Sequence, residues 1–148
     1  MNTRRIALAA LVAWIVDSVY GFVVFGLLLN GQFAKYPGVF RSFEAVSSML
    51  PQMFAASLLA FLAVAYIFAK GHDGGPGLQE GLRFGLVFAT YGLFGISIPT
   101  YAIYNIGPTI AIQTAFCAFI EMLLAGVVLG LVYKPSAAAK PVGRAVGV

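Results

Sequence analysis

The chain has 148 residues, of which 61% are hydrophobic and 9% are charged, whereas soluble domains carry roughly 45–50% apolar and about 25% charged residues. This composition excludes a soluble globular domain, a disordered chain and, with a single cysteine, a disulfide scaffold. The net charge of +4 comes from scattered Lys and Arg residues and indicates no nucleic-acid partner. We therefore expect an integral membrane protein whose main partner is the lipid bilayer.

Four apolar runs are long enough to cross a bilayer, because a membrane helix needs about 20 apolar residues. They cover about residues 6–29, 51–69, 82–104 and 108–133. Uninterrupted runs differ from the alternating strands of a membrane barrel, so we predict an all-α, multi-pass transmembrane four-helix bundle. The bundle forms a single domain over residues 1–133, and an Ala-, Pro- and Lys-rich cytoplasmic tail at 134–148 is expected to be disordered.

The first run, 6–29, carries one charged residue, Asp17. Asp17 shares a helical stripe with the small residues Ala10, Ala13 and Gly21, so we expect it to face another helix. The run exceeds the roughly 7–15 apolar residues of a cleavable signal peptide, and we therefore interpret it as a membrane helix.

The loop at 30–50 is the one long connection. Val39, Phe43, Val46 and Leu50 recur in it at helical spacing with polar residues between them. This pattern predicts a short amphipathic helix on the outer membrane surface, kinked at Pro51 into the second span. A lid over a cavity entrance is the functional alternative.

The second run has no charge and leads into a Gly-rich loop at 71–77. No strand precedes this loop and no Gly-Lys-Ser/Thr follows it, so it is not a phosphate-binding loop. His72, the single histidine, and Cys117 are too few for a zinc or haem site, and we expect no cofactor and no metal. Glu80 and Arg83 are predicted to pair at the start of the third helix.

The third and fourth runs each have a polar side and a glycine side. We expect the polar sides to face a common interior and the glycine sides to pack against neighbouring helices, a second protomer or another membrane protein. The polar sides hold Thr90, Ser97, Tyr101 and Tyr104 in the third run, and Gln113, Thr114, Cys117 and Glu121 in the fourth; the glycine sides hold Gly81, Gly85, Gly92 and Gly95, and Gly126 and Gly130. Pro99 predicts a kink or an unwound stretch at 95–99.

Asp17 and Glu121 are expected at the same depth, about 16 and about 18 Å from one membrane surface at ~1.5 Å per residue. A charge at the bilayer centre costs roughly 2.5–3.5 kcal/mol on insertion scales, so one or both acids should be protonated. The two acids either hold neighbouring helices together by hydrogen bonding or form a proton- or cation-binding site. The full set of candidate site residues is Asp17, Glu121, Tyr20, Thr90, Tyr91 and Gln113.

Seven of the nine Lys and Arg residues lie on the side of the termini and the middle loop. The positive-inside rule therefore predicts a protein of the cell (inner) membrane with both termini in the cytoplasm.

The stretch at 69–85, AKGHDGGPGLQEGLRFG, together with Asp17, Tyr20 and Gly21, resembles small bacterial four-helix membrane proteins with a domain of unknown function. The resemblance covers most of the chain but implies no activity. Small multidrug-resistance transporters are similar in helix count and in using a membrane acid, which is a Glu in the first helix, where Asp17 stands here. Those transporters are shorter and lack a long outer loop, so no residue roles are carried over.

The sequence favours a protein that binds a proton or a small cationic or apolar ligand between its helices, as a transporter or sensor component. The alternative is a non-catalytic structural or accessory subunit of a larger membrane assembly. No Ser/His, metal or cofactor constellation is present, so we do not expect an enzyme.

Overall fold

The computed structural model describes residues 3–133, and in this range every regular element is a helix. The predicted disordered tail at 134–148 lies outside the described residues. Two of the helical segments, η1 and η2, are π-helices, in which hydrogen bonds join residues five apart. The elements are α1 (Thr3–Gly21), η1 (Phe22–Leu28), α2 (Asn30–Phe33), α3 (Phe43–Ser47), α4 (Leu50–Gly71), α5 (Gly77–Tyr91), η2 (Gly92–Ser97), α6 (Ile98–Ile103) and α7 (Pro108–Val132).

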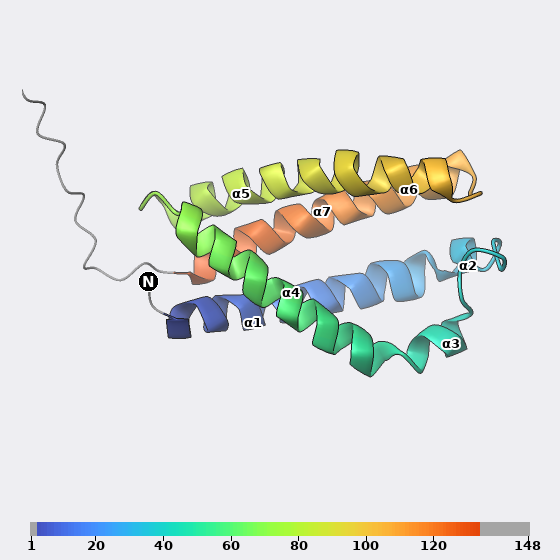
Figure 1. Ribbon diagram of the computed structural model, residues 1–148, viewed down its shortest axis with the longest axis horizontal. Helices are drawn as coiled ribbons and strands as arrows, with labels where there is room; N and C mark the ends of the chain where they lie inside the picture. The colour runs from blue at the N-terminus through green and yellow to red at the C-terminus, as the bar shows by residue number, and fades with distance from the viewer. Residues whose placement is uncertain (1–2, 134–148) are drawn as a thin grey trace, which may run out of the picture.

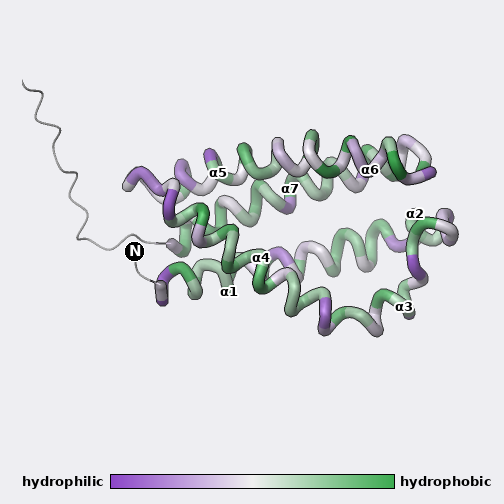
Figure 2. Tube along the Cα trace, in the orientation of Figure 1, coloured by the Kyte–Doolittle hydropathy of each residue, from purple (hydrophilic) through white to green (hydrophobic). Residues whose placement is uncertain are grey.

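Four continuous helical stretches are long and apolar enough to cross a membrane, as predicted: Thr3–Leu28, Leu50–Gly71, Gly77–Ile103 and Pro108–Val132. Figure 2 shows that these stretches are mostly hydrophobic and that hydrophilic residues gather in the loops at the two ends. The third stretch begins at Gly77 rather than at residue 82, because its first turn already packs against α7.

The four stretches form a bundle in which α7 is central (Figure 1). One side of α7 contacts α5, and another side contacts α1, while α4 packs mainly on α1. The end that holds the start of α1, the α4–α5 loop and the end of α7 is called here the α4–α5 end. The opposite end, with α2, α3 and the α6–α7 turn, is called the α2–α3 end.

Glycines allow direct backbone contact between α5 and α7. We call Gly77, Gly81 and Gly85 of α5 with Gly126 and Gly130 of α7 the glycine seam. A Cβ atom at Gly81 would lie 2.6 Å from the Gly126 carbonyl oxygen, and one at Gly85 would lie 2.8 Å from the Leu123 carbonyl oxygen. The glycine side of each helix thus packs against a neighbouring helix, as predicted, except at Gly95, which is exposed and meets only the Tyr91 ring of its own stretch. The seam lies within one chain, so an oligomer would have to form through other surfaces.

Alanines allow a similarly close approach of α1 to its neighbours at the α4–α5 end. Ala9, Ala10 and Ala13 are fully buried there. The core at this end consists of Ile6, Ala9, Ala10, Ala13, Ala65, Phe68, Ala69, Leu129 and Tyr133. Phe68 lies edge-on to the rings of Phe84, His72 and Tyr133 at centroid distances of 5.3, 5.7 and 5.9 Å. Side chains therefore close the bundle at the α4–α5 end.

The helices separate toward the α2–α3 end, where α4 runs away from α7 (Figure 1). Among the described residues of that half, Leu29 and Ile110 are the buried large hydrophobics. One polar contact joins the first loop to the α6–α7 turn: the Tyr36 hydroxyl oxygen accepts a hydrogen bond from the Gly107 backbone N–H at 3.2 Å. This half is therefore packed more loosely than the other.

The first loop contains less helix than its apolar spacing predicts. The helix α3 covers only Phe43–Ser47 and starts at Ser42, whose hydroxyl oxygen accepts from the Ala45 N–H. Val39 lies before this helix, and the bend predicted at Pro51 lies two residues earlier, at the turn of Ser48 and Met49 between α3 and α4. Pro51 lies in the first turn of α4, where a missing N–H donor leaves no hydrogen bond unmade.

The predicted interruption near Pro99 is a π-helix rather than an unwound stretch. The π-helix η2 ends at Ser97, and Pro99 lies in the first turn of α6. The second π-helix, η1, was not expected, because no proline marks it. Both π-helices begin at a Tyr-Gly pair, Tyr20-Gly21 in the first stretch and Tyr91-Gly92 in the third.

We predict that Gly126→Ala destabilises the protein by about 1–3 kcal/mol, because overpacking forces backbones apart. A Cβ atom at Gly126 would lie 2.6 Å from the Gly85 nitrogen and 2.7 Å from the Gly81 carbonyl oxygen. The matched control is Gly26→Ala, whose Cβ atom would meet only the Phe22 ring at 3.5 Å. The measurement is denaturant unfolding in detergent, and equal stability of the two variants would contradict the role of the seam.

Candidate functional site

Two acids lie on the first and last long helices, which pack against each other. Asp17 on α1 and Glu121 on α7 are half-buried, and they lie at the same level of the bundle, because each is about one helical turn from a hydrogen bond that joins Tyr20 to Cys117. The Glu121 Oε1 atom lies against the backbone of α1, since a Cβ atom at Gly21 would be 3.3 Å from it. We call Asp17 and Glu121 the carboxyl pair. Glycine at position 21 gives the Glu121 side chain the space to lie against α1, one helical turn from Asp17.

A tyrosine lies beside the carboxyl pair and links the same two helices. The Tyr20 hydroxyl donates a hydrogen bond to the Cys117 backbone oxygen at 2.9 Å. Cys117 is one helical turn before Glu121, so this bond fixes α1 relative to α7 at the level of the acids. The predicted site residues Asp17, Tyr20 and Glu121 are therefore together in the structure.

The packing of small residues explains why the acids meet. Asp17 follows the fully buried Ala10 and Ala13 on one stripe of α1. Glu121 precedes the buried residues Ala125 and Leu129 on one stripe of α7. Both stripes turn toward the bundle interior, and the acids lie where the close packing of the α4–α5 end stops and η1 begins.

Thr90 and Tyr91 do not join this site. Both are exposed on α5, and the Thr90 hydroxyl donates to the Leu86 backbone oxygen at 2.8 Å. The glycine seam determines this orientation, because α5 turns its glycine side to α7 and its opposite side outward. The expectation that the polar side of the third helix faces inward is therefore wrong at Thr90 and also at the exposed Tyr104.

Gln113 lies on α7, two turns from Glu121 toward the α2–α3 end. Its Oε1 atom is buried and has no hydrogen-bond partner in the described part of the chain. The structure thus places Gln113 on the same helix as Glu121 but does not bring it into contact with the carboxyl pair through any hydrogen bond.

One link between helices near the site was not predicted. The Trp14 Nε1–H donates to the Ser57 hydroxyl oxygen on α4 at 2.9 Å, and the Phe54 ring lies edge-on to Trp14. A lone serine in an apolar run gives little sign of its partner in the sequence. This bond holds α4 against α1 one turn before Asp17.

Two cavities lie in the looser half of the bundle. The larger, about 520 Å³, is an apolar groove between η2, α6 and α7 that includes Leu93, Phe116 and Phe119. The smaller, about 200 Å³, lies between η1, η2, α6 and α7. Its walls are formed by Phe25, Ile96, Ser97, Thr100, Tyr101, Ile106, Ala111, Thr114 and Ala118.

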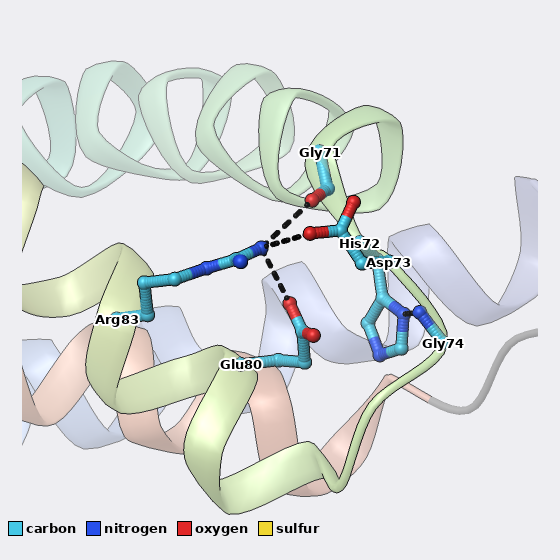
Figure 3. Close-up of polar contacts among 6 residues, drawn as sticks. All are labelled: Gly71, His72, Asp73, Gly74, Glu80 and Arg83. Atoms are coloured by element: carbon cyan, nitrogen blue, oxygen red, sulfur yellow. Dashed lines mark hydrogen bonds and ion pairs between the residues drawn. The ribbon is translucent and has the colours of Figure 1, made fainter.

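A second polar cluster, at the α4–α5 loop, is internally satisfied (Figure 3). The Arg83 guanidinium pairs with Asp73 at 2.7 Å and with Glu80 at 3.0 Å, which confirms the predicted Glu80–Arg83 pair. The His72 Nδ1 atom accepts from the Gly74 N–H at 2.9 Å. These bonds shape the loop, and among residues 3–133 no group of three metal-ligating side chains occurs.

Comparisons of the chain with protein-family models, with curated proteins and with solved structures found no match. Function is therefore argued from the chemistry of the site. The carboxyl pair is the feature that apolar packing alone does not explain, because an ionisable group inside a membrane helix is costly and is retained mainly for function.

We predict that Tyr20→Phe lowers stability by about 0.5–1.5 kcal/mol, the usual contribution of one hydrogen bond. Tyr91→Phe is the matched control, because Tyr91 also precedes a glycine at a π-helix but is 62% exposed. Denaturant unfolding of both variants in detergent measures the difference. A loss of stability in Tyr91→Phe as large as in Tyr20→Phe would contradict a specific α1–α7 bond.

Proposed function

We propose that the chain is a multi-pass protein of the cell membrane that binds a proton or a small cation between Asp17 and Glu121, as a transporter or sensor component. The observation that carries this proposal is the carboxyl pair, two acids at one level on neighbouring apolar helices that the Tyr20–Cys117 hydrogen bond joins. Binding without catalysis is proposed, because a carboxyl pair with one tyrosine provides no nucleophile and no activating base.

The chemistry of two neighbouring carboxyl groups supports this function. In a low dielectric, two carboxylates repel each other strongly, so a bound proton or cation lowers the free energy of the pair. Such a site exchanges its ligand with water only if a route to water exists. The alanine core of the α4–α5 end and the looser α2–α3 end favour exchange from one side.

One-sided closure favours a transporter or a sensor over a permanently open channel. Phe68, His72 and Tyr133 pack together between the carboxyl pair and the α4–α5 end. A transporter must open this end in a second conformation, whereas a sensor only needs to change the packing around the pair when the ligand binds.

The second candidate function is a structural or accessory subunit, in which the acids only connect helices. The Tyr20–Cys117 hydrogen bond and the glycine seam favour this reading, because both hold the bundle rigid without any ligand. The two functions differ in whether the carboxyl pair changes its protonation under working conditions.

We predict that Asp17→Asn and Glu121→Gln each leave the protein folded but lower proton uptake by the reconstituted protein, because an amide cannot titrate. Proton uptake is measured with a pH-sensitive dye during jumps across the range of about pH 5 to about pH 9, in which buried carboxyls titrate. The matched control is Glu80→Gln, which removes an acid that is 8% exposed but is paired with Arg83 in the loop.

The control variant should keep the proton uptake that depends on Asp17 and Glu121. Proton uptake and cation-dependent thermal stability that are unchanged in both Asp17→Asn and Glu121→Gln would eliminate the binding function. The accessory-subunit function would then take its place.

The proposal includes an orientation, with both termini in the cytoplasm and α3 on the outer membrane surface, because Lys and Arg are concentrated at the α4–α5 end. The amphipathic composition of α3 and its exposed Phe43 fit contact with lipid headgroups and acyl chains.

We predict that, in a Cys117→Ser chain, Gly38→Cys reacts with an impermeant maleimide on intact cells, whereas Gly71→Cys reacts only after permeabilisation. Both glycines have no neighbour within 4 Å of an added Cβ atom, so neither substitution disturbs packing. Reaction of both residues from the same side would show that the chain does not cross the membrane between residues 38 and 71. The reversed pattern would show that the termini lie outside the cell.

A further inference from the structure

We propose that the smaller cavity is the water-filled route by which protons or small monovalent cations reach the carboxyl pair from the α2–α3 end. This inference rests on the proposed function, since it assigns a path to the same site. It also narrows the ligand to species that travel with water and excludes organic cations and apolar molecules.

The inner end of the cavity lies one helical turn from the acids. Ala118, in its wall, is three residues before Glu121 on α7. Phe25, also in its wall, is four residues after Gly21, the residue that contacts the Glu121 carboxyl group. Phe25 and Ala118 thus form the floor between the cavity and the carboxyl pair, at a separation of about one 5.4 Å helical turn.

The outer end of the cavity lies at the α6–α7 turn. Thr100 and Ile106 belong to its wall, and Ile106 is in the connection between α6 and α7. The cavity therefore extends over the looser half of the bundle, from the α6–α7 turn to about one helical turn from the acids. In the opposite direction, the alanine core fills the space between the helices.

Hydroxyl groups give the cavity polar positions along its length. Ser97, Thr100, Tyr101 and Thr114 are among the residues that line it, although most of the wall is apolar. The Thr114 hydroxyl donates to the Ile110 backbone oxygen at 2.8 Å, so its own oxygen can accept a bond from water. The rest of the wall is apolar and offers water no hydrogen bonds, so water in the cavity would be weakly bound.

The size of the cavity determines what can pass. A volume of about 200 Å³ holds about six waters at ~30 Å³ each, and it is below the roughly 300–1,000 Å³ of pockets for organic ligands. The larger groove has enough volume for an organic molecule, but it lies on the side of α7 that carries Phe116 and Phe119. That side is turned away from Glu121, so the groove does not lead to the carboxyl pair.

The two π-helices explain why the cavity exists. Phe25 belongs to η1, and Ile96 and Ser97 belong to η2, so both π-helices contribute to its wall. A π-helix is wider than an α-helix and has one extra residue per turn, which prevents close packing against a regular neighbour. The floor residue Phe25 belongs to η1, so its direction depends on the π-helical geometry of this segment.

The test is thiol labelling of the full chain in proteoliposomes, in a Cys117→Ser background. Ser97→Cys and Thr114→Cys place a thiol in the cavity wall, and Thr90→Cys places one on the exposed, lipid-facing side of the same long stretch as Ser97. The probe is a cationic, membrane-impermeant methanethiosulfonate. Since only a hydrated thiol ionises and reacts, the two cavity thiols should react at least roughly tenfold faster than Thr90→Cys.

Reaction must come from the α2–α3 side, with the side fixed by the Gly38→Cys and Gly71→Cys reporters. Equal rates at Ser97→Cys and Thr90→Cys, or reaction from the α4–α5 side only, would overturn the path. In the otherwise native chain, Phe25→Ala should accelerate modification of Cys117, and an unchanged rate would overturn the assignment of the floor.

These rates do not depend on any titration of the acids, so the two proposals fail separately. Fast labelling of the cavity with normal proton uptake in Asp17→Asn and Glu121→Gln rejects the proposed function and supports a hydrated cavity. Slow labelling with proton uptake that depends on both acids supports the function and rejects this path.

Discussion

Backbone contact along the glycine seam is the constraint on which the rest of the bundle depends. Because Gly81 and Gly126 leave no room for a side chain between α5 and α7, the rotation of each helix about its own axis is fixed. For α5 this rotation turns Thr90 outward. For α7 it turns the opposite side, with Cys117 and Glu121, toward α1, and the carboxyl pair follows from that orientation.

The same contact also explains the difference between the two ends. Where glycines and alanines face each other, helices approach closely and van der Waals contact fills the interior. Beyond Gly92 the third stretch becomes a π-helix, the contacting side chains become larger, and cavities remain between η2, α6 and α7. The acids lie at this boundary, with dense packing on one side of them and cavities on the other.

Several features could be predicted from the sequence because they depend on composition or on spacing within one helix. Hydrophobic length predicts the four long helices, and the spacing of Ala10, Ala13 and Asp17 predicts an inward-facing acid. The equal depth of Asp17 and Glu121 follows from counting residues. These inferences require no knowledge of which helices are neighbours.

The remaining features depend on neighbours and could not be predicted. A helical wheel separates Thr90 from the glycines, but it does not say which side faces the interior, and here glycine contact prevails over burial of a hydroxyl. The π-helix η1 has no proline to mark it, and the Tyr20–Cys117 and Trp14–Ser57 bonds join residues far apart in the chain. The folding of residues 30–50 also depends on contacts such as Tyr36 with Gly107.

The position of Glu121 in the last long helix has a consequence for biosynthesis. For a chain that enters the membrane in the order of its synthesis, Asp17 is inserted about a hundred residues before its partner exists. Until α7 arrives, α1 carries an acid with no carboxyl partner and an incomplete packing surface, which makes it a poor lipid-facing helix. The first helix should therefore stay beside the insertion machinery until the last helix has been made, so that the bundle forms around α1 in one late step.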